Sequence, residues 1–286
     1  MLYVKVVITA GGLGTRLLPI TKELPKEMLP IFVREKTCIV LKPLLQALFE
    51  QLYEFGFREF CFVVGRGKRA IEDHFTPDWD FVSKLKNRGK YNLANELAKF
   101  YQMVESSKMA FINQPNPIGF GHAVLTAKFF IGNEAFMVCA GDTYIISPLK
   151  SFLKTMMNAF ENDVSATLLL QKVSNPKEYG VALVNSSSNY YNVLGVVEKP
   201  EIPPSNLAIM PFYLFRPEIF DILEQLKPGF GGEIQLTDAI QGLIDLGRKV
   251  SAVMLRDDEI RLDIGTPENY WEAIRMSYEY SVRGLE

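Results

Sequence analysis

Short apolar runs rich in β-branched residues alternate with amphipathic helical patterns along most of the chain. Val4–Ala10 is the first such run and stops at Gly11 and Gly12, which predicts a buried strand that enters a glycine turn. Pro43–Phe55 then carries leucines at helical spacing, and Phe60–Val64 is a second buried strand. The order strand, turn, helix, strand predicts a right-handed βαβ unit in a mostly parallel sheet.

The same alternation predicts the remaining elements. Further strands are expected at Met109–Asn113, Ala135–Ala140, Ala166–Lys172, Val181–Val184, Val193–Val197, Leu207–Phe215 and Lys249–Leu255. Further helices are expected at Lys68–Phe75, Leu93–Val104, Gly121–Phe130, Leu149–Phe160, Pro217–Leu226, Gln235–Leu246 and Pro267–Val282. Two strands separated by Asn-Ser-Ser-Ser-Asn at 185–189 predict a hairpin. We therefore expect one α/β domain, Rossmann-like, whose mixed, mostly parallel sheet is flanked by helices and has small antiparallel additions in the second half.

The composition of the 286 residues excludes several classes of protein. Hydrophobic residues make up 48% and charged residues 22%, as in a globular protein with a sizeable core. The net charge is −2 and no long basic run occurs, so nucleic acid is not an expected partner. No apolar run could span a bilayer, and the first twelve residues lack the pattern of a signal peptide. We therefore expect a cytoplasmic protein with no membrane partner.

The few cysteines and histidines limit the metal chemistry. Cys38, Cys61 and Cys139 form no CxxC pair, which argues against a zinc ribbon or a disulfide framework. His74 and His122 are the two histidines, so a three-histidine metal site is impossible. A metal would need carboxylate ligands, which favours a hard cation such as Mg²⁺. We expect His74 on a helix surface, and His122 to pack or cap at the start of a helix, with help near a ligand as the alternative.

The most informative segment is GGLGTRLLPITKELPKEMLP, residues 11–30, directly after the first strand. It is not a P-loop, because no Gly-Lys-Ser/Thr closes it. It is not a dinucleotide fingerprint either, because Leu17 stands at the third glycine position. What remains is a glycine turn whose backbone N–H groups can approach a phosphate. Arg16 can span two phosphate oxygens, and Lys26 can supply a point charge.

This segment resembles the signature of the sugar-phosphate nucleotidylyltransferases, and its ending Lys-Glu-Met-Leu-Pro is similar to the uridylyl branch of that family. Further segments similar to the family follow in order: GRGKRAIEDHF (65–75), GFGHAV (119–124), GD (141–142), EYGVA (178–182), VVEKP (196–200), PSNLAI (204–209), GEIQLTDAI (232–240) and LDIGT (262–266). The resemblance covers nearly the whole chain. It implies one nucleotidyltransferase domain over 1–286, with a nucleotide-binding half at about 1–145, a sugar-phosphate-binding half at about 146–266 and a C-terminal helix at 267–286.

The resemblance implies a Mg²⁺-dependent enzyme that transfers a uridylyl group from UTP to glucose-1-phosphate, giving UDP-glucose and pyrophosphate. It implies that Arg16, Lys26 and Asp142 are catalytic. Such a transfer depends on positioning and on neutralising charge on the phosphate oxygens. Asp142 and Asp263 each stand at the end of a strand-like run, and the resemblance makes them the Mg²⁺ ligands. Either aspartate alone would serve equally well as a cap of a helix or turn.

The resemblance also assigns the binding residues. The nucleotide would be bound by Gly11, Gly12, Gly14, Thr15, Gln114 and Gly119. The Gln114 amide can donate and accept at once, which suits the O4 and N3–H edge of uracil or thymine. The sugar phosphate would contact the backbone of Gly180, while Glu198 accepts from the sugar hydroxyls and Lys199 holds the phosphate.

Departures from the family pattern leave the substrates open. Pro115 and Pro117 are more similar to the glucose-1-phosphate thymidylyltransferases, whereas the long excursion at about residues 77–108 is similar to the uridylyl branch. A longer segment at 34–42 and the run Met210–Tyr213 also depart from the pattern, and either would reshape the sugar pocket or an interface. Thymidylyl transfer and transfer to another sugar-1-phosphate therefore stand as alternatives.

Other classes of function and the state of assembly complete the expectations. A non-catalytic regulator that binds nucleotide sugars is disfavoured by the retained charged residues, and a dinucleotide-dependent oxidoreductase by the missing third glycine. The resemblance implies a homo-oligomer, either a dimer or a tetramer. The last predicted helix has aromatic residues to spare for an interface, at Tyr270, Trp271, Tyr278 and Tyr280.

Overall fold

The computed structural model describes residues 3–35, 38–186 and 190–283. A nine-stranded sheet forms its centre, in the order β5-β4-β1-β6-β11-β8-β12-β10-β9. These strands are β1 (Val4–Ala10), β4 (Glu59–Val64), β5 (Lys108–Asn113), β6 (Ala135–Ala140), β8 (Val164–Lys172), β9 (Gly180–Ser186), β10 (Tyr191–Glu198), β11 (Leu207–Phe215) and β12 (Lys249–Met254). All nine lie at or close to the positions that the apolar runs predict.

The direction of pairing changes midway across the sheet. β5, β4, β1 and β6 are parallel to one another, as the βαβ pattern predicts. β11 runs antiparallel to both β6 and β8, whereas β8 and β12 are parallel. β9 and β10 pair antiparallel, which confirms the expected hairpin strands, although residues 187–189 of its turn lie outside the described residues. The sheet is thus mixed, with the antiparallel additions in the second half.

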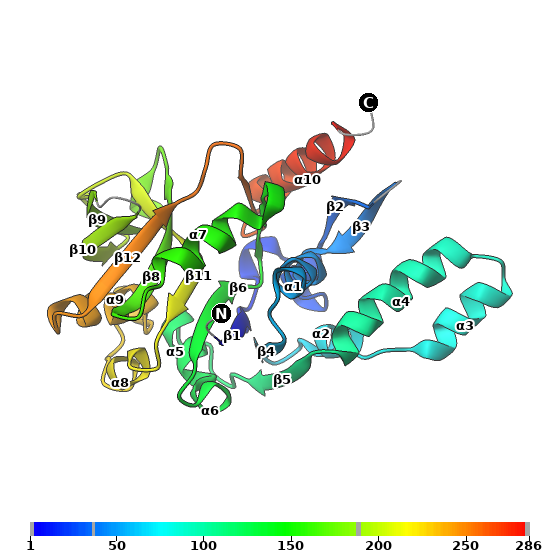
Figure 1. The fold of residues 1–286 in the computed structure, drawn as a ribbon, viewed down its shortest axis with the longest axis horizontal. Helices are drawn as coiled ribbons and strands as arrows, with labels where there is room; N and C mark the ends of the chain where they lie inside the picture. The colour runs from blue at the N-terminus through cyan, green and yellow to red at the C-terminus, as the bar shows by residue number, and fades with distance from the viewer. Residues whose placement is uncertain (1–2, 36–37, 187–189, 284–286) are drawn as a thin grey trace.

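Helices cover both faces of the sheet (Figure 1). α1 (Leu44–Phe55), α4 (Tyr91–Glu105) and α7 (Ser151–Ala159) bury their apolar sides against one face. The other face is covered by α5 (Phe120–Thr126), α6 (Lys128–Ile131), α8 (Ile219–Leu223) and α9 (Leu236–Asp245). Cys61 and Cys139 are buried, as their apolar surroundings predict. No helix among the described residues combines the length and the apolar character that crossing a membrane requires.

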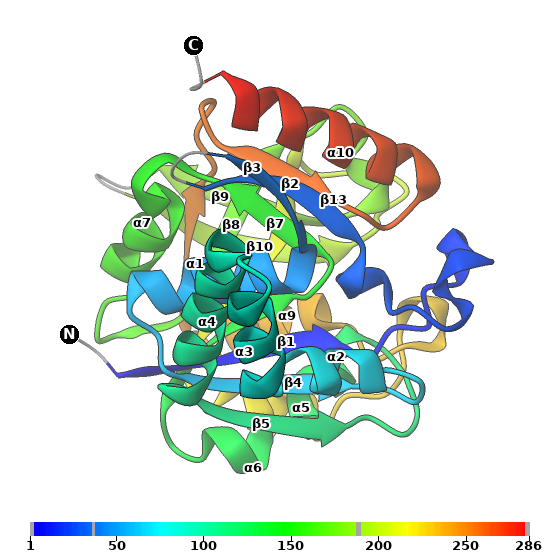
Figure 2. The same ribbon diagram turned by 90° about the vertical axis from the view of Figure 1, so that its right-hand side faces the viewer.

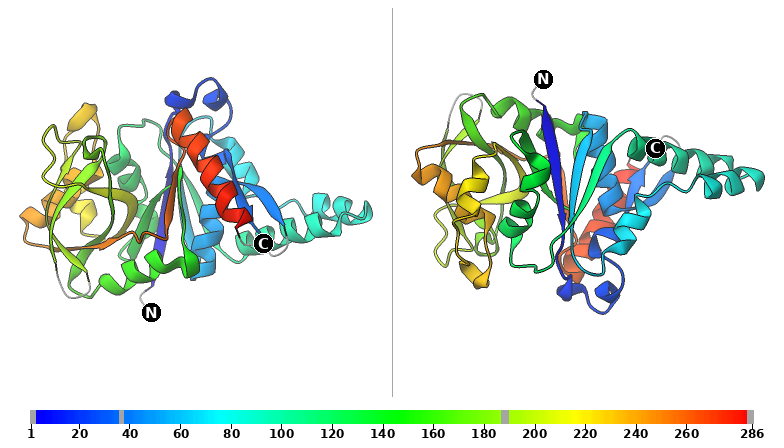
Figure 3. Two further views of the ribbon diagram at one scale, coloured as in Figure 1. Left: turned by 90° about the horizontal axis from the view of Figure 1, so that it is seen from above. Right: turned by 90° about the horizontal axis from the view of Figure 1, so that it is seen from below.

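Four strands outside the main sheet were not predicted, whereas the last helix lies where the sequence predicts it. β2 (Pro30–Arg34) pairs with β3 (Ile39–Pro43), and β7 (Thr143–Ile146) pairs with β13 (Ile260–Asp263), both antiparallel. α10 (Pro267–Val282) packs against β2 and β13 around a third, smaller core (Figures 2 and 3). These strands are only four or five residues long, so they show little periodicity in the sequence.

The excursion predicted from Pro77 onward is a helical hairpin that projects from the body of the protein (Figure 1). α3 (Trp79–Asn87) packs antiparallel along α4. The short helix α2 (Arg69–His74) precedes it. His74 contradicts the expected surface position, because its Nε2 contacts Gln46 Oε1 at 2.9 Å and its ring packs on Phe75 and Phe100. Burial lowers the pKa of His74 to about 4.

The residues that follow the parallel strands all lie at one edge of the sheet. Since β1, β4, β5 and β6 are parallel, their carboxyl ends lie together, where ligands bind in open α/β sheets. The backbone is tightly packed at this edge. A Cβ on Gly65, which follows β4, would lie only 2.8 Å from the carbonyl oxygen of Gly11, which follows β1. Gly141 follows β6, and its N–H donates to the Thr9 carbonyl at 2.8 Å.

A buried ion pair joins the glycine-rich segment to the turn after β4. Glu27 lies in a short 3-10 helix, Lys26–Met28, and is 1% exposed, while Lys68 just before α2 is 8% exposed. Lys68 Nζ donates to Glu27 Oε2 at 2.8 Å. Burial raises the pKa of Glu27, and the positive charges of Lys68 and Lys26 oppose that rise. Because an uncompensated buried carboxylate is costly, this pair holds the segment against the sheet.

We expect Lys68→Met to lower the free energy of unfolding by about 3–5 kcal/mol at pH 8, because it leaves Glu27 buried without its partner. The loss should shrink toward pH 5. A carboxyl group whose folded pKa lies above its unfolded value contributes stability below the unfolded pKa and loses it as the pH rises through the folded pKa. Urea unfolding at both pH values measures the difference.

The matched control is Lys22→Met, because Lys22 is exposed and its ammonium lies 3.8 Å from the exposed Glu23 carboxylate. This control should unfold like the unaltered protein. The double variant Glu27→Gln with Lys68→Met should recover most of the loss. Equal effects of Lys68→Met and Lys22→Met at pH 8 would contradict the assignment.

Candidate active site

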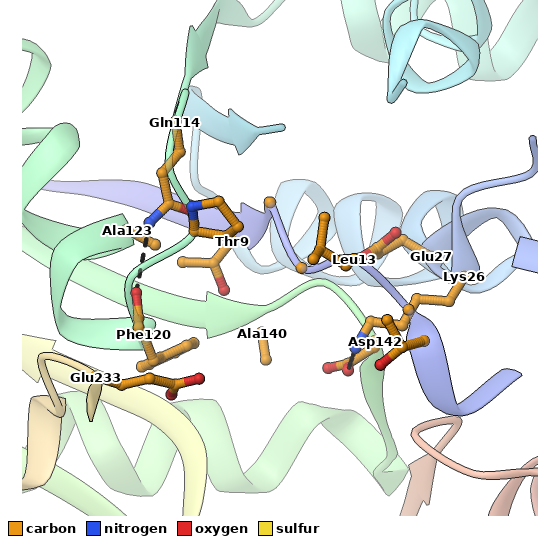
Figure 4. A pocket seen from close by; sticks show the side chains of 16 residues that line it. Thr9, Leu13, Lys26, Glu27, Gln114, Phe120, Ala123, Ala140, Asp142 and Glu233 are labelled. Atoms are coloured by element: carbon orange, nitrogen blue, oxygen red, sulfur yellow. Dashed lines mark hydrogen bonds and ion pairs between the residues drawn. The ribbon is translucent and has the colours of Figure 1, made fainter. Parts of the chain in front are cut away.

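A continuous cleft opens at the carboxyl edge of the parallel strands. It consists of two adjoining cavities of about 350 and 520 Å³, which share the glycine turn, Lys26 and Asp142. In the first cavity, Gln114 and Glu233 lie at one side and the joined Lys26 and Asp142 at the other (Figure 4). The cleft is lined by all the residues assigned from the sequence: Gly11, Gly12, Gly14, Thr15, Arg16, Lys26, Gln114, Gly119, Asp142, Gly180, Glu198, Lys199 and Asp263.

The turn after β1 requires glycine at two positions. Gly14 has a φ of 66°, in the left-handed region, and its carbonyl oxygen accepts from Thr21 Oγ1 at 2.7 Å. Gly11 lies so close to Gln114 that a Cβ would be 2.5 Å from the amide oxygen. Thr15–Leu17 then forms a 3-10 helix, from which Arg16 lines the second cavity. The turn therefore brings bare backbone and a cation to the cleft.

Lys26 and Asp142 form an ion pair where the two cavities meet (Figure 4). Burial lowers the pKa of Lys26, but Asp142 and Glu27 outweigh it and the net pKa is raised. Burial also raises the pKa of Asp142, but Lys26 outweighs it and the net pKa is lowered. Both groups are therefore charged at neutral pH. The centre of the cleft holds a cation and a carboxylate side by side.

Gln114 and Gly119 shape the far side of the first cavity. Gln114 follows β5, is buried, and its N–H donates to the Val64 carbonyl at 2.7 Å. Gly119 has a φ of 118°, and a Cβ there would lie 2.5 Å from the carbonyl oxygen of Ile234, so a side chain would push this loop away. Gln114 Nε2 contacts His122 Nδ1 at 2.8 Å. His122 thus does more than pack or cap.

The second cavity contains a network around Glu198, the last residue of β10. Glu198 Oε2 accepts from Thr237 Oγ1 at 2.6 Å, and Glu198 Oε1 lies 3.4 Å from Lys199 Nζ. Lys199 has a φ of 42°, which is uncommon for a residue with a side chain and costs free energy. Its N–H donates to the Tyr179 carbonyl at 3.0 Å. A Cβ on Gly180 would lie 3.0 Å from Glu198 Oε2, so glycine keeps this space open.

Asp263 reaches the cleft through the short β7–β13 pair. It lies opposite Thr143, the residue that follows Asp142. The Asp263 carboxylate accepts from the Gly265 N–H at 2.7 Å and lies 3.5 Å from the Arg261 guanidinium. Two aspartates separated by 121 positions (263 − 142) thus line the same cavity.

Asp142 and Asp263 could hold a cation in this cavity, because both carboxylates line it. Within the part of the chain that the structure describes, no group of three or more His, Cys, Asp or Glu side chains is arranged to bind a metal. Two carboxylates suit Mg²⁺, which usually takes waters and substrate phosphates as its other ligands. The donor set therefore fits a hard cation bound together with a phosphate, rather than a closed structural zinc site.

Several residues that support the site were missed from the sequence. Thr237 holds Glu198, Arg261 contacts Asp263, and Glu233 lines both cavities. The ion pair between Glu27 and Lys68 holds the glycine-rich segment against the turn after β4. Four of these five residues belong to segments that resemble the family, and Arg261 directly precedes one, but no pattern there distinguishes a side chain that faces the cleft from one that faces its neighbours.

The arrangement suits transfer of a phosphate-linked group between two ligands. The first cavity offers an amide and bare backbone, the second offers a carboxylate and a lysine, and cations with carboxylates lie between them. Fixed charges around a developing negative charge are worth more in a partly buried cleft than in water. The charged side chains of the lining supply charge stabilisation and positioning.

Comparisons with known proteins agree with this description. The model of the nucleotidyl transferase family matches residues 5–279. A UTP–glucose-1-phosphate uridylyltransferase of Bacillus subtilis (strain 168) is 40% identical over 249 residues, which are 85% of this chain and 81% of that protein.

Two solved structures have the same fold over almost their whole length. A UDP-glucose pyrophosphorylase complexed with UDP-glucose is 34% identical with a TM-score of 0.84, covering 98% of this chain and 100% of that one. The UTP-bound UGPase from Acinetobacter baumannii is 28% identical with a TM-score of 0.81, covering 100% of both chains. The protein is therefore an enzyme that belongs to the nucleotidyl transferase family, among the relatives of the UTP–glucose-1-phosphate uridylyltransferases.

Proposed function

We propose that this enzyme transfers a uridylyl group from UTP to glucose-1-phosphate, giving UDP-glucose and pyrophosphate. One observation carries the proposal: a single cleft joins an amide-lined cavity to a cavity with an acceptor carboxylate and a lysine, and the Lys26–Asp142 pair lies between them. The names of the relatives support the choice of substrates. One similar structure is described with UDP-glucose and another with UTP.

In this proposal, the nucleotide occupies the first cavity. Its base lies against Gln114 and Gly119, and its triphosphate lies along the turn formed by Gly11, Gly12, Gly14 and Thr15. Backbone N–H groups of a glycine turn can donate to phosphate oxygens. Arg16 and Lys26 add positive charge beside those oxygens.

The sugar phosphate occupies the second cavity. The Gly180 backbone approaches the sugar ring, Glu198 accepts from its hydroxyls, and Lys199 holds the phosphate. Thr237 already occupies Glu198 Oε2, which leaves Oε1 beside Lys199 as the freer acceptor. A phosphate oxygen of glucose-1-phosphate then attacks the α-phosphorus of UTP, and the bond from that phosphorus to the β-phosphate oxygen breaks as pyrophosphate leaves.

Catalysis in this scheme consists of placement and charge stabilisation. The two substrates carry several negative charges, and these repel one another unless nearby cations neutralise them. Lys26 pairs with Asp142 where the cavities meet, so its ammonium would lie beside the reacting phosphorus. Arg16 supplies a second cation from the turn. No covalent intermediate with the protein is required.

Nucleotidyl transferases generally use a divalent metal, and we propose Mg²⁺ for this enzyme. Asp142 and Asp263 would hold it, since both line the cavity in which the phosphates would lie. When bound, the cation would neutralise part of the charge on the phosphate oxygens. Lys26 would remain close to Asp142 as the organic cation of the site.

The proposal also places the two substrates in two parts of one domain, 1–286. Residues at about 1–145 would bind the nucleotide, and residues at about 146–266 the sugar phosphate, with 267–286 as a C-terminal helix. Glu233 departs from this division, because it lines the first cavity from the second half. The proposed substrates are free metabolites of the cell interior, so we propose a cytoplasmic location.

We further propose a homo-oligomer, a dimer or a tetramer, that uses α10 and the neighbouring hairpin β2–β3. Trp271 is 64% exposed and Tyr278 is 50% exposed on α10, and Leu41 on β3 is 57% exposed. Tyr270 is less suited to an interface than expected, because its hydroxyl donates to the Pro30 carbonyl of the same chain. Exposed large apolar side chains that gather on one surface are typical of an interface.

The proposed reaction predicts that pyrophosphate is released fastest with UTP and glucose-1-phosphate in a panel of nucleoside triphosphates and sugar-1-phosphates. EDTA should abolish the release and added Mg²⁺ should restore it. Asp263→Asn should lose most of the turnover, because it removes a ligand charge. The exposed Asp163→Asn is the control and should keep full activity.

Three outcomes of this assay would change the proposal. A higher kcat/KM with dTTP would move the enzyme to thymidylyl transfer, and a higher rate with another sugar would change the acceptor. No release with any pair would favour a nucleotide-sugar-binding regulator. Full activity in EDTA would remove the metal from the mechanism.

The two-cavity layout predicts that one variant from each region affects a different kinetic constant. Lys26→Ala should lower kcat by about 10²–10³, because it removes a cation beside the reacting phosphates. Glu198→Gln should raise the KM for glucose-1-phosphate and leave UTP affinity unchanged, because a neutral acceptor binds hydroxyls less strongly than a charged one. Initial rates against each substrate and calorimetric titration of UTP measure both effects. The exposed Lys22→Ala is the control, and a loss of UTP binding in Glu198→Gln would refute the layout.

The oligomer predicts a mass in solution of two or four times 32.4 kDa by light scattering. Trp271→Asp should lower this mass, because it places a charge in the proposed apolar interface. Phe129→Asp is the matched control, since Phe129 is fully exposed on α6, far from α10 in the fold. A monomeric mass for the unaltered protein would refute the assembly.

A further inference from the structure

The amide of Gln114 is a polar group at one side of the first cavity, and its two ends have different surroundings. Nε2 lies 3.4 Å from the carbonyl oxygen of Gly119 and 2.8 Å from Nδ1 of His122. Oε1 lies beside the Cα of Gly11, where a Cβ would come within 2.5 Å of it. Among the described residues, no group donates a hydrogen bond to Oε1. The amide therefore has one satisfied end and one free end.

The orientation of this amide follows from its neighbours. A backbone carbonyl can only accept, so the end of the amide that faces Gly119 must be the nitrogen. With Nε2 fixed as the donor, His122 Nδ1 must accept the second N–H. The His122 ring is therefore neutral, with its hydrogen on Nε2 and a lone pair on Nδ1. The opposite orientation would set two oxygens against each other at Gly119.

His122 is held in place by α5, on which it is the third residue. The start of that helix is anchored, because the Gly121 N–H donates to the Ile234 carbonyl at 2.9 Å and Gly119 leaves no room for a side chain at the same contact. The carbonyl oxygen of His122 accepts from Thr126 Oγ1 at 2.8 Å. The ring is thus carried on a helix, does not itself line the cavity within the described part of the chain, and reaches it through Gln114.

We propose that His122 is a positioning residue that fixes the Gln114 amide so that Oε1 faces the nucleotide base, and that it thereby selects uracil over cytosine. The inference rests on the proposed function. Uracil carries a hydrogen on N3 and can donate to Oε1. Cytosine has a lone pair at N3, which would face Oε1 as a second acceptor. A site whose buried polar group is left unpaired by the wrong ligand discriminates strongly against it.

Two variants of nearly equal shape separate this role from simple packing. His122→Asn keeps an acceptor, because its Oδ1 can replace Nδ1 toward Gln114 Nε2. His122→Leu has a similar volume and no acceptor, so Gln114 is free to turn its nitrogen toward the base. We expect His122→Leu to lower the ratio of kcat/KM for UTP to that for CTP by at least about tenfold, and His122→Asn to keep the ratio within about threefold.

The two substrates give the internal control. The KM for glucose-1-phosphate should be unchanged in both variants, because the sugar side of the cleft does not contact His122 or Gln114. A purely structural role would lower both rates together and leave the ratio unmoved. Equal ratios in His122→Leu and the unaltered enzyme would overturn the inference, and so would equal losses of the ratio in both variants.

Nuclear magnetic resonance of the unaltered protein tests the inference even if His122→Leu fails to fold. With two histidines in the chain, ¹⁵N signals of the rings can be assigned by comparison with His122→Asn. We expect the neutral tautomer with hydrogen on Nε2, and a ring with hydrogen on Nδ1 would overturn the assignment. Calorimetric titration of UTP and CTP distinguishes a failure of this inference from a failure of the proposed reaction. If UTP and CTP bind equally, the inference fails, whereas tight UTP binding without pyrophosphate release means that only the reaction fails.

Discussion

The parallel pairing of β1 with β4 on one side and β6 on the other is the constraint on which the site depends. Because these strands run in one direction, every loop that leaves them begins at the same edge of the sheet. The spacing between neighbouring strands then forces those loops into contact, and Gly11, Gly65 and Gly141 are the residues that tolerate the contact. A side chain at Gly65 would collide with the backbone on which the nucleotide is proposed to lie.

The charged groups at that edge form a chain in which positive and negative side chains alternate. Lys68 faces Glu27, and Lys26 faces Asp142, while Glu27 and Lys26 are neighbours in the sequence. Each buried charge has an opposite charge beside it, which is the condition under which charged groups can leave water. The same arrangement keeps Lys26 protonated in a partly buried cleft, where burial alone would favour its neutral form.

Much of the fold could be predicted from the sequence, because apolar periodicity reports burial on a sheet or helix face. The strands of the main sheet show it clearly, and so do α1 and α9. The short ladders β2–β3 and β7–β13 could not be predicted, because four or five residues carry too little periodicity. α3 was missed because its residues are mostly polar and only Val82 is buried.

The site shows the same division. Arg16, Lys26 and Asp142 could be expected at the cleft because they follow a glycine turn or a strand and lie in segments that resemble the family, and all three line it. The partners of these residues could not, since Thr237 finds Glu198 and Lys68 finds Glu27 only once distant segments have packed. His74 and His122 illustrate the difficulty, because each stands on a short helix and the sequence does not show what its ring contacts. The His74 ring is half-buried against aromatic rings, and the His122 ring contacts the Gln114 amide at the cleft.

The β7–β13 ladder ties the last part of the chain to the middle of the site. Asp142 stands just before β7, and Asp263 is the final residue of β13, so the second carboxylate arrives only when that ladder closes. The glycine turn and Lys26 belong to the first part of the chain, so they are synthesised long before Asp263. A chain cut before β13 would therefore keep the glycine turn and Lys26 but lack the second carboxylate of the cavity.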